Sequence, residues 1–180
     1  MAIPSRTRRA RRAQFFAIDI VAGISFLLLL IFIYAAVANN FDLVINQREK
    51  SMQLSEAAQA ALEQLVTTAG FPSNWDAGNF SEQQISSLGL ASEPNVLDPG
   101  KVAAFFQAVS ADANKSAARD MLGLNRPGYD FSLQVRLLNG TVLASFGSLP
   151  ANATTTSQRT SFAAENGETV MVKLTAWTKD

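Results

Sequence analysis

The sequence predicts an α+β protein with one long N-terminal helix, followed by a small head of two short helices and a four-stranded antiparallel sheet. Three observations support this fold class. An apolar run covers residues 15–38, helical spacing of apolar residues continues to residue 69, and alternation of apolar and polar residues begins at Tyr129. Spacing of three and four residues is typical of an amphipathic helix, whereas alternation is typical of a half-buried strand.

The first half of the long helix is expected to cross a membrane. Five arginines precede the apolar run, and its roughly 24 residues at 1.5 Å each can span a hydrocarbon core of about 30 Å. The positive-inside bias keeps the arginines cytoplasmic, so we expect a single-pass protein of the cell membrane with an extracellular C-terminal domain. Asp19 is the one charge within the run. A carboxylate in hydrocarbon costs about 2.5–3.5 kcal/mol, so such a residue usually marks a partner.

The helix is expected to continue beyond the membrane. Neither Gly nor Pro interrupts residues 24–69, so a single helix of about 50 residues is predicted. Gly70 followed by Pro72 is a typical helix end. The apolar face of the second half should lie against the head or against neighbouring helices. The expected division is a basic leader at 1–13, a transmembrane half at 14–38, an amphipathic stalk half at 39–69 and the extracellular head at 70–180.

The first part of the head is expected to be irregular and to lead into two short helices. Residues 71–99 are rich in Ser, Asn, Gly and Pro. Five apolar side chains of this connector are expected in the core: Phe71, Trp75, Ile85, Leu88 and Leu90. Asp98 before Pro99 is an N-cap signal that predicts a helix over 99–109. A second helix is expected over 111–122, ending at Gly123.

Two Asn-Gly pairs predict two β-hairpins. Asn139-Gly140 separates alternating runs at 129–137 and 141–146, and the second pair, at 166–167, separates runs at 159–165 and 168–178. Asn-Gly favours a two-residue turn, in which both central residues need positive φ. A polar loop is expected at 150–157. The four strands should form one antiparallel sheet with one face on the long helix and the other partly in solvent.

The composition excludes several classes of site. The chain has no Cys and no His, which excludes disulfides, thiolate nucleophiles, imidazole bases and the usual zinc or haem ligands. The carboxylates lack the spacing of a catalytic or calcium motif, so we predict no enzyme, no catalytic residue, no metal and no cofactor. Ten basic residues against fifteen acidic ones follow residue 13, which argues against nucleic acid as a partner.

Four Asn-x-Ser/Thr sequons follow the apolar run. These candidate N-glycosylation sites of a glycoprotein are Asn79, Asn114, Asn139 and Asn152. All four lie on the side of the membrane that is predicted to be extracellular. In a chain rich in Ser and Thr some sequons arise by chance, and Asn139 also has a place in a predicted turn. The sequence therefore permits glycosylation without requiring it.

The N-terminal segment has three interpretations. The first is a secretory signal cleaved after Ala38, because residues 36–38 are small enough for signal peptidase. Its apolar stretch is, however, longer than the usual 7–15 or so residues. The second is an uncleaved membrane anchor, which leaves Asp19 without a role. The third is a precursor that is cut on the cytoplasmic side of the apolar run.

The third interpretation rests on a resemblance. Residues 12–19, with the sequence RAQFFAID, resemble the class III signal peptide of archaeal type IV pilin-like proteins. The resemblance implies that a prepilin peptidase cuts between Ala13 and Gln14, with Arg12 placed before the small residue. It also implies that Asp19 pairs with the new α-amine of a neighbouring subunit during assembly.

Several later segments resemble, more loosely, the ectodomains of the same family, so that the resemblance covers most of residues 11–138. These segments are 65–75, 88–91, 95–98 with 101–102 and Phe105, 118–123 and 129–131. The implied function is that of a cell-surface structural protein, namely a minor or specialised subunit of a pilus-like filament. Its implied partners are membrane lipid, prepilin peptidase, other pilin subunits and assembly machinery. The alternative is a single-pass, membrane-anchored extracellular binding or adhesion module that is neither processed nor polymerised.

Overall fold

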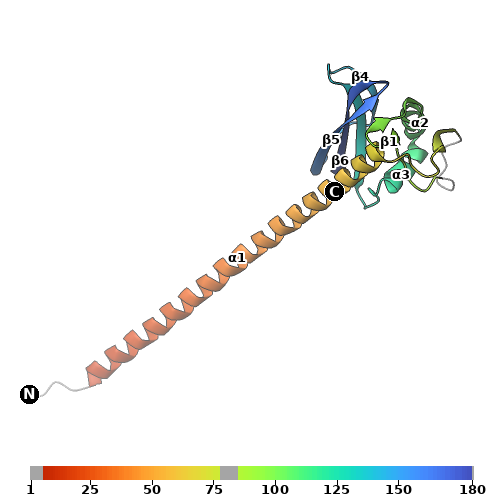
Figure 1. Ribbon diagram of the computed structural model, residues 1–180. Coiled ribbons are helices and arrows are strands. Elements are labelled where there is room, and N and C mark those ends of the chain that lie inside the picture. Colours follow the sequence, from red (N-terminus) through yellow and green to blue (C-terminus); the bar gives the residue numbers. More distant parts are fainter. Residues whose placement is uncertain (1–5, 78–84, 180) are drawn as a thin grey trace, which may run out of the picture. The chain divides into compact units, whose positions relative to one another are not determined.

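The computed structural model describes residues 6–77 and 85–179 and has the predicted α+β class (Figure 1). The chain divides into two compact units, residues 1–48 and 49–180. Helix α1 (Arg6–Thr67) contributes residues to both units. It begins eight residues before Gln14, where the transmembrane half was expected to begin. The leader is rich in Arg and Ala, both strong helix formers, and contains no Gly, which explains the earlier start.

The first unit contains the one helical segment, among the described residues, that is long and apolar enough to cross a membrane. This window, Ile20–Val37, has a mean hydropathy of 2.8, and none of it is buried within the chain. Its length and composition are compatible with a membrane span and also with a signal sequence. The sequence prediction of an N-terminal apolar helix is therefore confirmed.

The second half of α1 forms one side of the core of the head. Six of its apolar residues, spaced three and four apart, are at most 2% exposed: Leu54, Ala58, Ala61, Leu62, Leu65 and Val66. The amphipathic pattern therefore predicted the buried face correctly. The helix ends at Thr67, and Gly70 follows with φ +78°, a conformation typical of a residue after a helix end.

The last carbonyls of α1 accept hydrogen bonds from a segment that was predicted to be irregular. Leu65 O and Val66 O accept hydrogen bonds from the N–H groups of Leu90 and Asn95, each at 2.8 Å. Thr68 O, just beyond the helix end, accepts from a further N–H of this segment at 3.1 Å. Because the final carbonyls of a helix lack partners within the helix, these bonds fix the end of α1 to the head.

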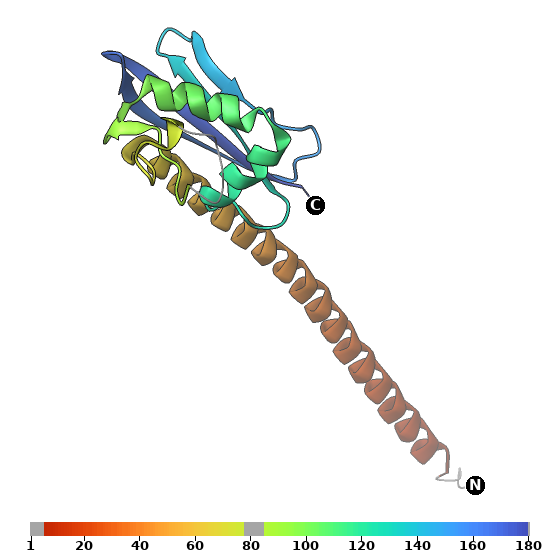
Figure 2. The same cartoon turned by 90° about the vertical axis from the view of Figure 1, so that its right-hand side faces the viewer.

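The two short helices lie where they were predicted. Helix α2 (Pro99–Val109) is capped by Asp98, whose carboxylate accepts from Gly100 N at 2.8 Å and from Lys101 N at 3.3 Å. Helix α3 (Asp112–Met121) follows after a short turn. Figure 2 shows α2 and the last turns of α1 on the same face of the sheet, and buried residues of both belong to a single hydrophobic cluster.

The sheet has six strands and is mixed, whereas four antiparallel strands were predicted. Its order is β1-β2-β5-β6-β3-β4. The strands are β1 (Ala91–Glu93), β2 (Val96–Leu97), β3 (Tyr129–Leu137), β4 (Val142–Phe146), β5 (Thr155–Glu165) and β6 (Glu168–Thr178). The parallel pair joins β2 to β5 through Val96 and Ala164, and the other pairs are antiparallel. Strands of three and two residues are too short to show a period, so β1 and β2 were missed.

The two Asn-Gly turns differ. Asn166 and Gly167 have φ of 52° and 81°, as expected for a two-residue hairpin turn. At the first hairpin only Gly140 has positive φ, and its N–H donates to Leu137 O at 3.0 Å. This pattern is a three-residue loop that ends in a glycine bulge, so the prediction of positive φ at Asn139 is wrong.

Two further expectations need correction. The polar loop predicted at 150–157 ends earlier, because β5 begins at Thr155 and pairs with β6 along its whole length. Threonine favours extended backbone, which explains this start within a polar segment. Phe71 is 68% exposed and lies outside the core, since its backbone is held in a bridge to Ser87. The other four apolar side chains expected in the core are buried: Trp75, Ile85, Leu88 and Leu90.

Candidate functional site

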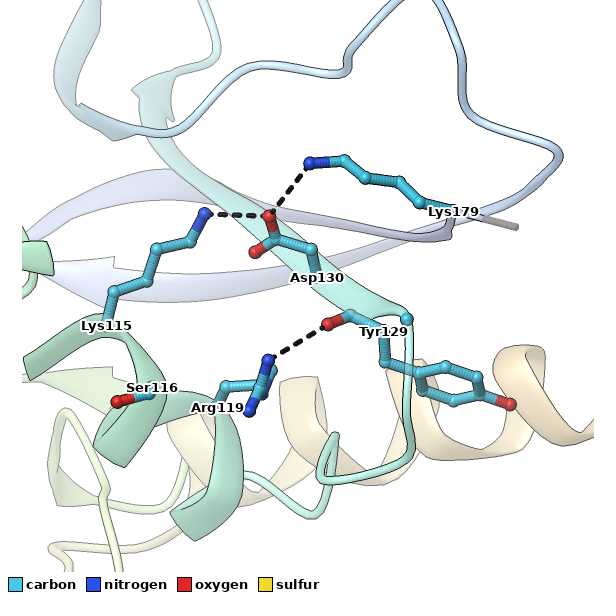
Figure 3. A pocket seen from close by; sticks show the side chains of 7 residues that line it. Lys115, Ser116, Arg119, Tyr129, Asp130 and Lys179 are labelled. Atoms are coloured by element: carbon cyan, nitrogen blue, oxygen red, sulfur yellow. Dashed lines mark hydrogen bonds and ion pairs between the residues drawn. The ribbon is translucent and has the colours of Figure 1, made fainter. Parts of the chain in front are cut away.

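A shallow pocket lies where helix α3, the start of β3 and the residue after β6 come together (Figure 3). Its volume is about 280 Å³, and seven residues line it: Lys115, Ser116, Arg119, Gly128, Tyr129, Asp130 and Lys179. Three of these residues are cationic and one is anionic. Residues 49–180 carry nine Lys and Arg against thirteen Asp and Glu, so the pocket is basic within an acidic unit.

Asp130 lies at the centre of the charged groups. Its Oδ2 accepts a hydrogen bond from Lys115 Nζ at 2.8 Å and lies 3.8 Å from Lys179 Nζ. Its Oδ1 accepts from the N–H of Phe131 at 2.8 Å. The side chain of Asp130 is 17% exposed, against 29% for Lys115 and 44% for Lys179. The carboxylate side chain is therefore the most buried of these three charged side chains, and both ammonium groups are directed at it.

The third cation comes from the same helix as Lys115. Lys115 and Arg119 are four residues apart on α3, so both project from one side of the helix. Arg119 Nη1 donates to Tyr129 O at 3.5 Å, and its Nε lies 3.4 Å from Asp120 Oδ1. Asp120 is 55% exposed and does not line the pocket. The guanidinium of Arg119 is thus held by the carbonyl of Tyr129, which lines the pocket, and by the carboxylate of Asp120, which lies outside it.

A glycine allows the two chain segments at the pocket wall to approach each other. Gly128 has φ +79°, and its carbonyl accepts a hydrogen bond from the N–H of Lys179 at 3.0 Å. A Cβ atom at this position would lie 2.6 Å from Lys179 O. Only glycine can therefore adopt this positive φ at position 128 without a clash between its side chain and Lys179 O.

A second hollow lies over the face of the sheet that is turned away from the helices. Its volume is about 240 Å³, and its polar lining includes Ser132, Gln134, Gln158, Lys173 and Thr175. It carries a single charged side chain. The pocket around Asp130 is therefore the stronger candidate for recognition of a charged ligand.

The predicted processing residues all lie within helix α1. Arg12, Ala13 and Gln14 are consecutive helical positions, and Asp19 directly precedes the apolar window that begins at Ile20. These four residues are therefore remote in sequence from the pocket. Their proposed roles in cleavage and assembly stay predictions.

The sequons differ in their surroundings. Asn139 lies in an exposed hairpin loop, where its Oδ1 accepts from Thr141 N at 2.9 Å, and Asn152 lies in an exposed loop before β5. Asn114 is half-buried, and its amide nitrogen donates to Ala108 O at 3.1 Å. Asn79 falls outside the described residues. Of the three described sequons, Asn139 and Asn152 are thus the more accessible to a glycosyltransferase.

No signal in the sequence marks the basic pocket, because its charged residues come from three separate segments. Within the described part of the chain, no group of three or more acidic residues is arranged to hold a metal ion. Comparisons of the chain with protein-family models, with curated proteins and with solved structures find no match. Function must therefore be inferred from the sequence pattern and from the geometry above.

Proposed function

We propose that this protein is a pilin-like structural protein of the cell surface, a minor or specialised subunit of an archaeal type IV pilus-like filament. A prepilin peptidase cuts the precursor before Gln14, and the remaining helix then assembles with those of other subunits. The observation that carries the proposal is the motif at Arg12, Ala13, Gln14 and Asp19 at the head of the apolar window Ile20–Val37.

The continuity of helix α1 supports the proposal. A secretory signal would be removed after Ala38, yet α1 continues through this position to Thr67 and ends inside the head. The apolar window is wholly unburied within a single chain, so it requires lipid or other protein as its environment. Packing of such helices against one another in a filament meets this requirement once the subunit leaves the membrane.

Asp19 gives the assembly a specific electrostatic requirement. Cleavage before Gln14 creates an α-amine and removes all five arginines of the leader. A carboxylate six residues into an apolar helix loses hydration when helices pack together. An α-amine from a neighbouring subunit compensates that loss, because opposite charges in a medium of low dielectric attract strongly.

The second candidate is a membrane-anchored extracellular binding module that keeps its leader. The same apolar window favours it, since an uncleaved anchor needs only length and hydropathy. The mature N-terminus separates the two functions. Intact-mass measurement on the full chain produced in an archaeal host with prepilin peptidase should give a protein that begins at Gln14. A mature protein that retains Met1 or Ala2 supports the anchor instead.

Two variants test cleavage and assembly separately. Ala13→Leu should block cleavage, because the residue before the cut must be small, whereas Ala10→Leu within the leader should leave cleavage unchanged. Asp19→Ala should allow cleavage but lower incorporation into surface filaments by about tenfold, whereas Asp42→Ala beyond the apolar window should not. Normal incorporation of both Ala13→Leu and Asp19→Ala would refute the proposed function.

A further inference from the structure

We propose that the pocket around Asp130 binds an acidic sugar residue, of the hexuronate class, on a surface glycan. This inference goes beyond the proposed function. It applies equally to a subunit in a filament and to a singly anchored protein, because none of the residues concerned belongs to the N-terminal segment.

The pocket holds more donors than its own residues use. Each lysine ammonium has three N–H donors. Among the described residues, Lys115 Nζ donates one hydrogen bond, to Asp130, and lies 5.7 Å from the centroid of the Phe146 ring, whereas Lys179 Nζ lies 3.8 Å from Asp130, beyond hydrogen-bond distance. Within the described residues, Lys115 therefore keeps two N–H groups, one of which can face the Phe146 ring, and Lys179 keeps three. The guanidinium of Arg119 adds five, of which its contacts with Tyr129 O and Asp120 engage only part. Such a group of unused cationic donors favours a ligand with a carboxylate or another oxyanion.

The carboxylate of Asp130 limits which class of anionic ligand the pocket can bind. Its carboxylate has about four acceptor positions, and within the described residues two of them are filled, by hydrogen bonds from Lys115 and from the N–H of Phe131. A ligand hydroxyl can donate to the open positions, whereas sulfate has no hydroxyl group and is repelled by the negative charge of Asp130. The combination of three cations and a carboxylate with open acceptor positions therefore favours an anion that also carries hydroxyl groups.

Among the described residues, the pairing of Asp130 does not require three cations at this pocket. One lysine suffices to pair the half-buried carboxylate of Asp130, and Lys115 does so at 2.8 Å. The ammonium of Lys179 also extends toward Asp130, as Figure 3 shows, but at 3.8 Å and with a side chain that is 44% exposed it adds little to that pair. A volume of about 280 Å³ lies at the lower end of the range for ligand sites, which is appropriate for one sugar ring rather than for a large cofactor.

The test is calorimetric titration of the full chain in a sugar-free zwitterionic detergent at low ionic strength. The probes are tetragalacturonate, the neutral maltotetraose and sodium sulfate. Tetragalacturonate should bind, and maltotetraose should not, because it lacks the carboxylate. Sulfate should bind more weakly than tetragalacturonate. Arg119→Gln should weaken tetragalacturonate binding by about tenfold or more, as expected for the loss of one charge-assisted hydrogen bond, whereas Lys173→Gln in the second hollow should leave it unchanged.

Asp130→Asn distinguishes an acidic sugar from a bare anion. Removal of the negative charge should strengthen sulfate binding, whereas tetragalacturonate also loses an acceptor for its hydroxyl. The preference for tetragalacturonate over sulfate should therefore fall by at least about threefold. Equal binding of the two anions in the unmodified protein, an unchanged preference in Asp130→Asn, or no binding of tetragalacturonate would each overturn the proposal. None of these results would bear on cleavage before Gln14.

Discussion

Lys101 holds helix α2 against the end of α1 and the start of β1, and its replacement by methionine should strongly destabilise the head. The residue is in the first turn of α2 and is 5% exposed. Its ammonium donates to Ala69 O at 2.9 Å and to Ala91 O at 3.3 Å, so it joins α2 to the end of α1 and to the start of β1. No carboxylate within the described residues pairs with it.

The expected loss follows from these two bonds. A hydrogen bond to a charged group contributes about 1.5–3 kcal/mol, so the two together contribute roughly 3–6 kcal/mol. Methionine has a similar length and avoids the cost of burying an ammonium, which offsets part of the loss. The carbonyls of Ala69 and Ala91 then lose the hydrogen-bond donor that Lys101 supplies. We therefore expect Lys101→Met to lower the free energy of unfolding of the head by about 2–4 kcal/mol.

Urea unfolding followed by tryptophan fluorescence measures this loss. The chain has two tryptophans, Trp75 at 4% and Trp177 at 2% exposure, and both belong to the head. Fluorescence of the full chain in detergent therefore reports the unfolding of the head alone. Lys173→Met on the half-exposed face of β6 is the matched control, with an expected change below about 0.5 kcal/mol. If Lys101→Met unfolds at the same urea concentration as this control, the ammonium does not stabilise the junction.

Two further substitutions test the head with the same assay. Gly89→Ala places a Cβ atom 2.1 Å from Thr68 O and should cost about 3 kcal/mol or prevent folding, whereas Gly23→Ala meets nothing within 4 Å and should leave the head unchanged. Burial raises the pKa of the Glu165 carboxyl, so its folded state binds protons more tightly than the unfolded chain, and stability falls as pH rises through the raised pKa. Glu165→Gln should therefore raise the urea midpoint at pH 7 more than at pH 4, and an equal gain at both pH values would contradict the assignment. Glu168→Gln at the exposed opposite position is the control.

Local patterns predicted those elements whose form depends on neighbours in sequence. The buried face of α1, the cap at Asp98 and the second hairpin turn at Asn166-Gly167 follow from periodicity and backbone preference. Strand β2 could not be predicted in this way. Its two residues are held by a parallel pairing of Val96 with Ala164, which lies 68 positions further along the chain. No local preference encodes such a contact, which depends on the packing of the whole head.

The basic pocket was missed for the same reason. Lys115 and Asp130 are 15 residues apart and belong to a helix and a strand, and Lys179 follows the last strand. In the sequence each of the three resembles an ordinary solvated charge. Only the register of β3 with β6, which pairs Tyr129 with Thr178, brings Asp130 and Lys179 to the same end of the sheet.

The hydrophobic core of the head begins well after the N-terminal motif in sequence. The proposed roles of that motif in cleavage and assembly can therefore be tested while the head stays folded. The first buried residue of α1, among those whose side chains are described, is Leu54, and the hydrophobic cluster of the head contains no residue before it. Ala13 and Asp19 belong to the other unit, residues 1–48, so we expect the tryptophan fluorescence of variants at these positions to match that of the unmodified protein. A variant that fails to enter filaments while its head unfolds at the normal urea concentration has lost assembly rather than stability. A shifted midpoint in Asp19→Ala would show that the apolar helix also stabilises the head, and reduced incorporation could then no longer be assigned to the lost carboxylate alone.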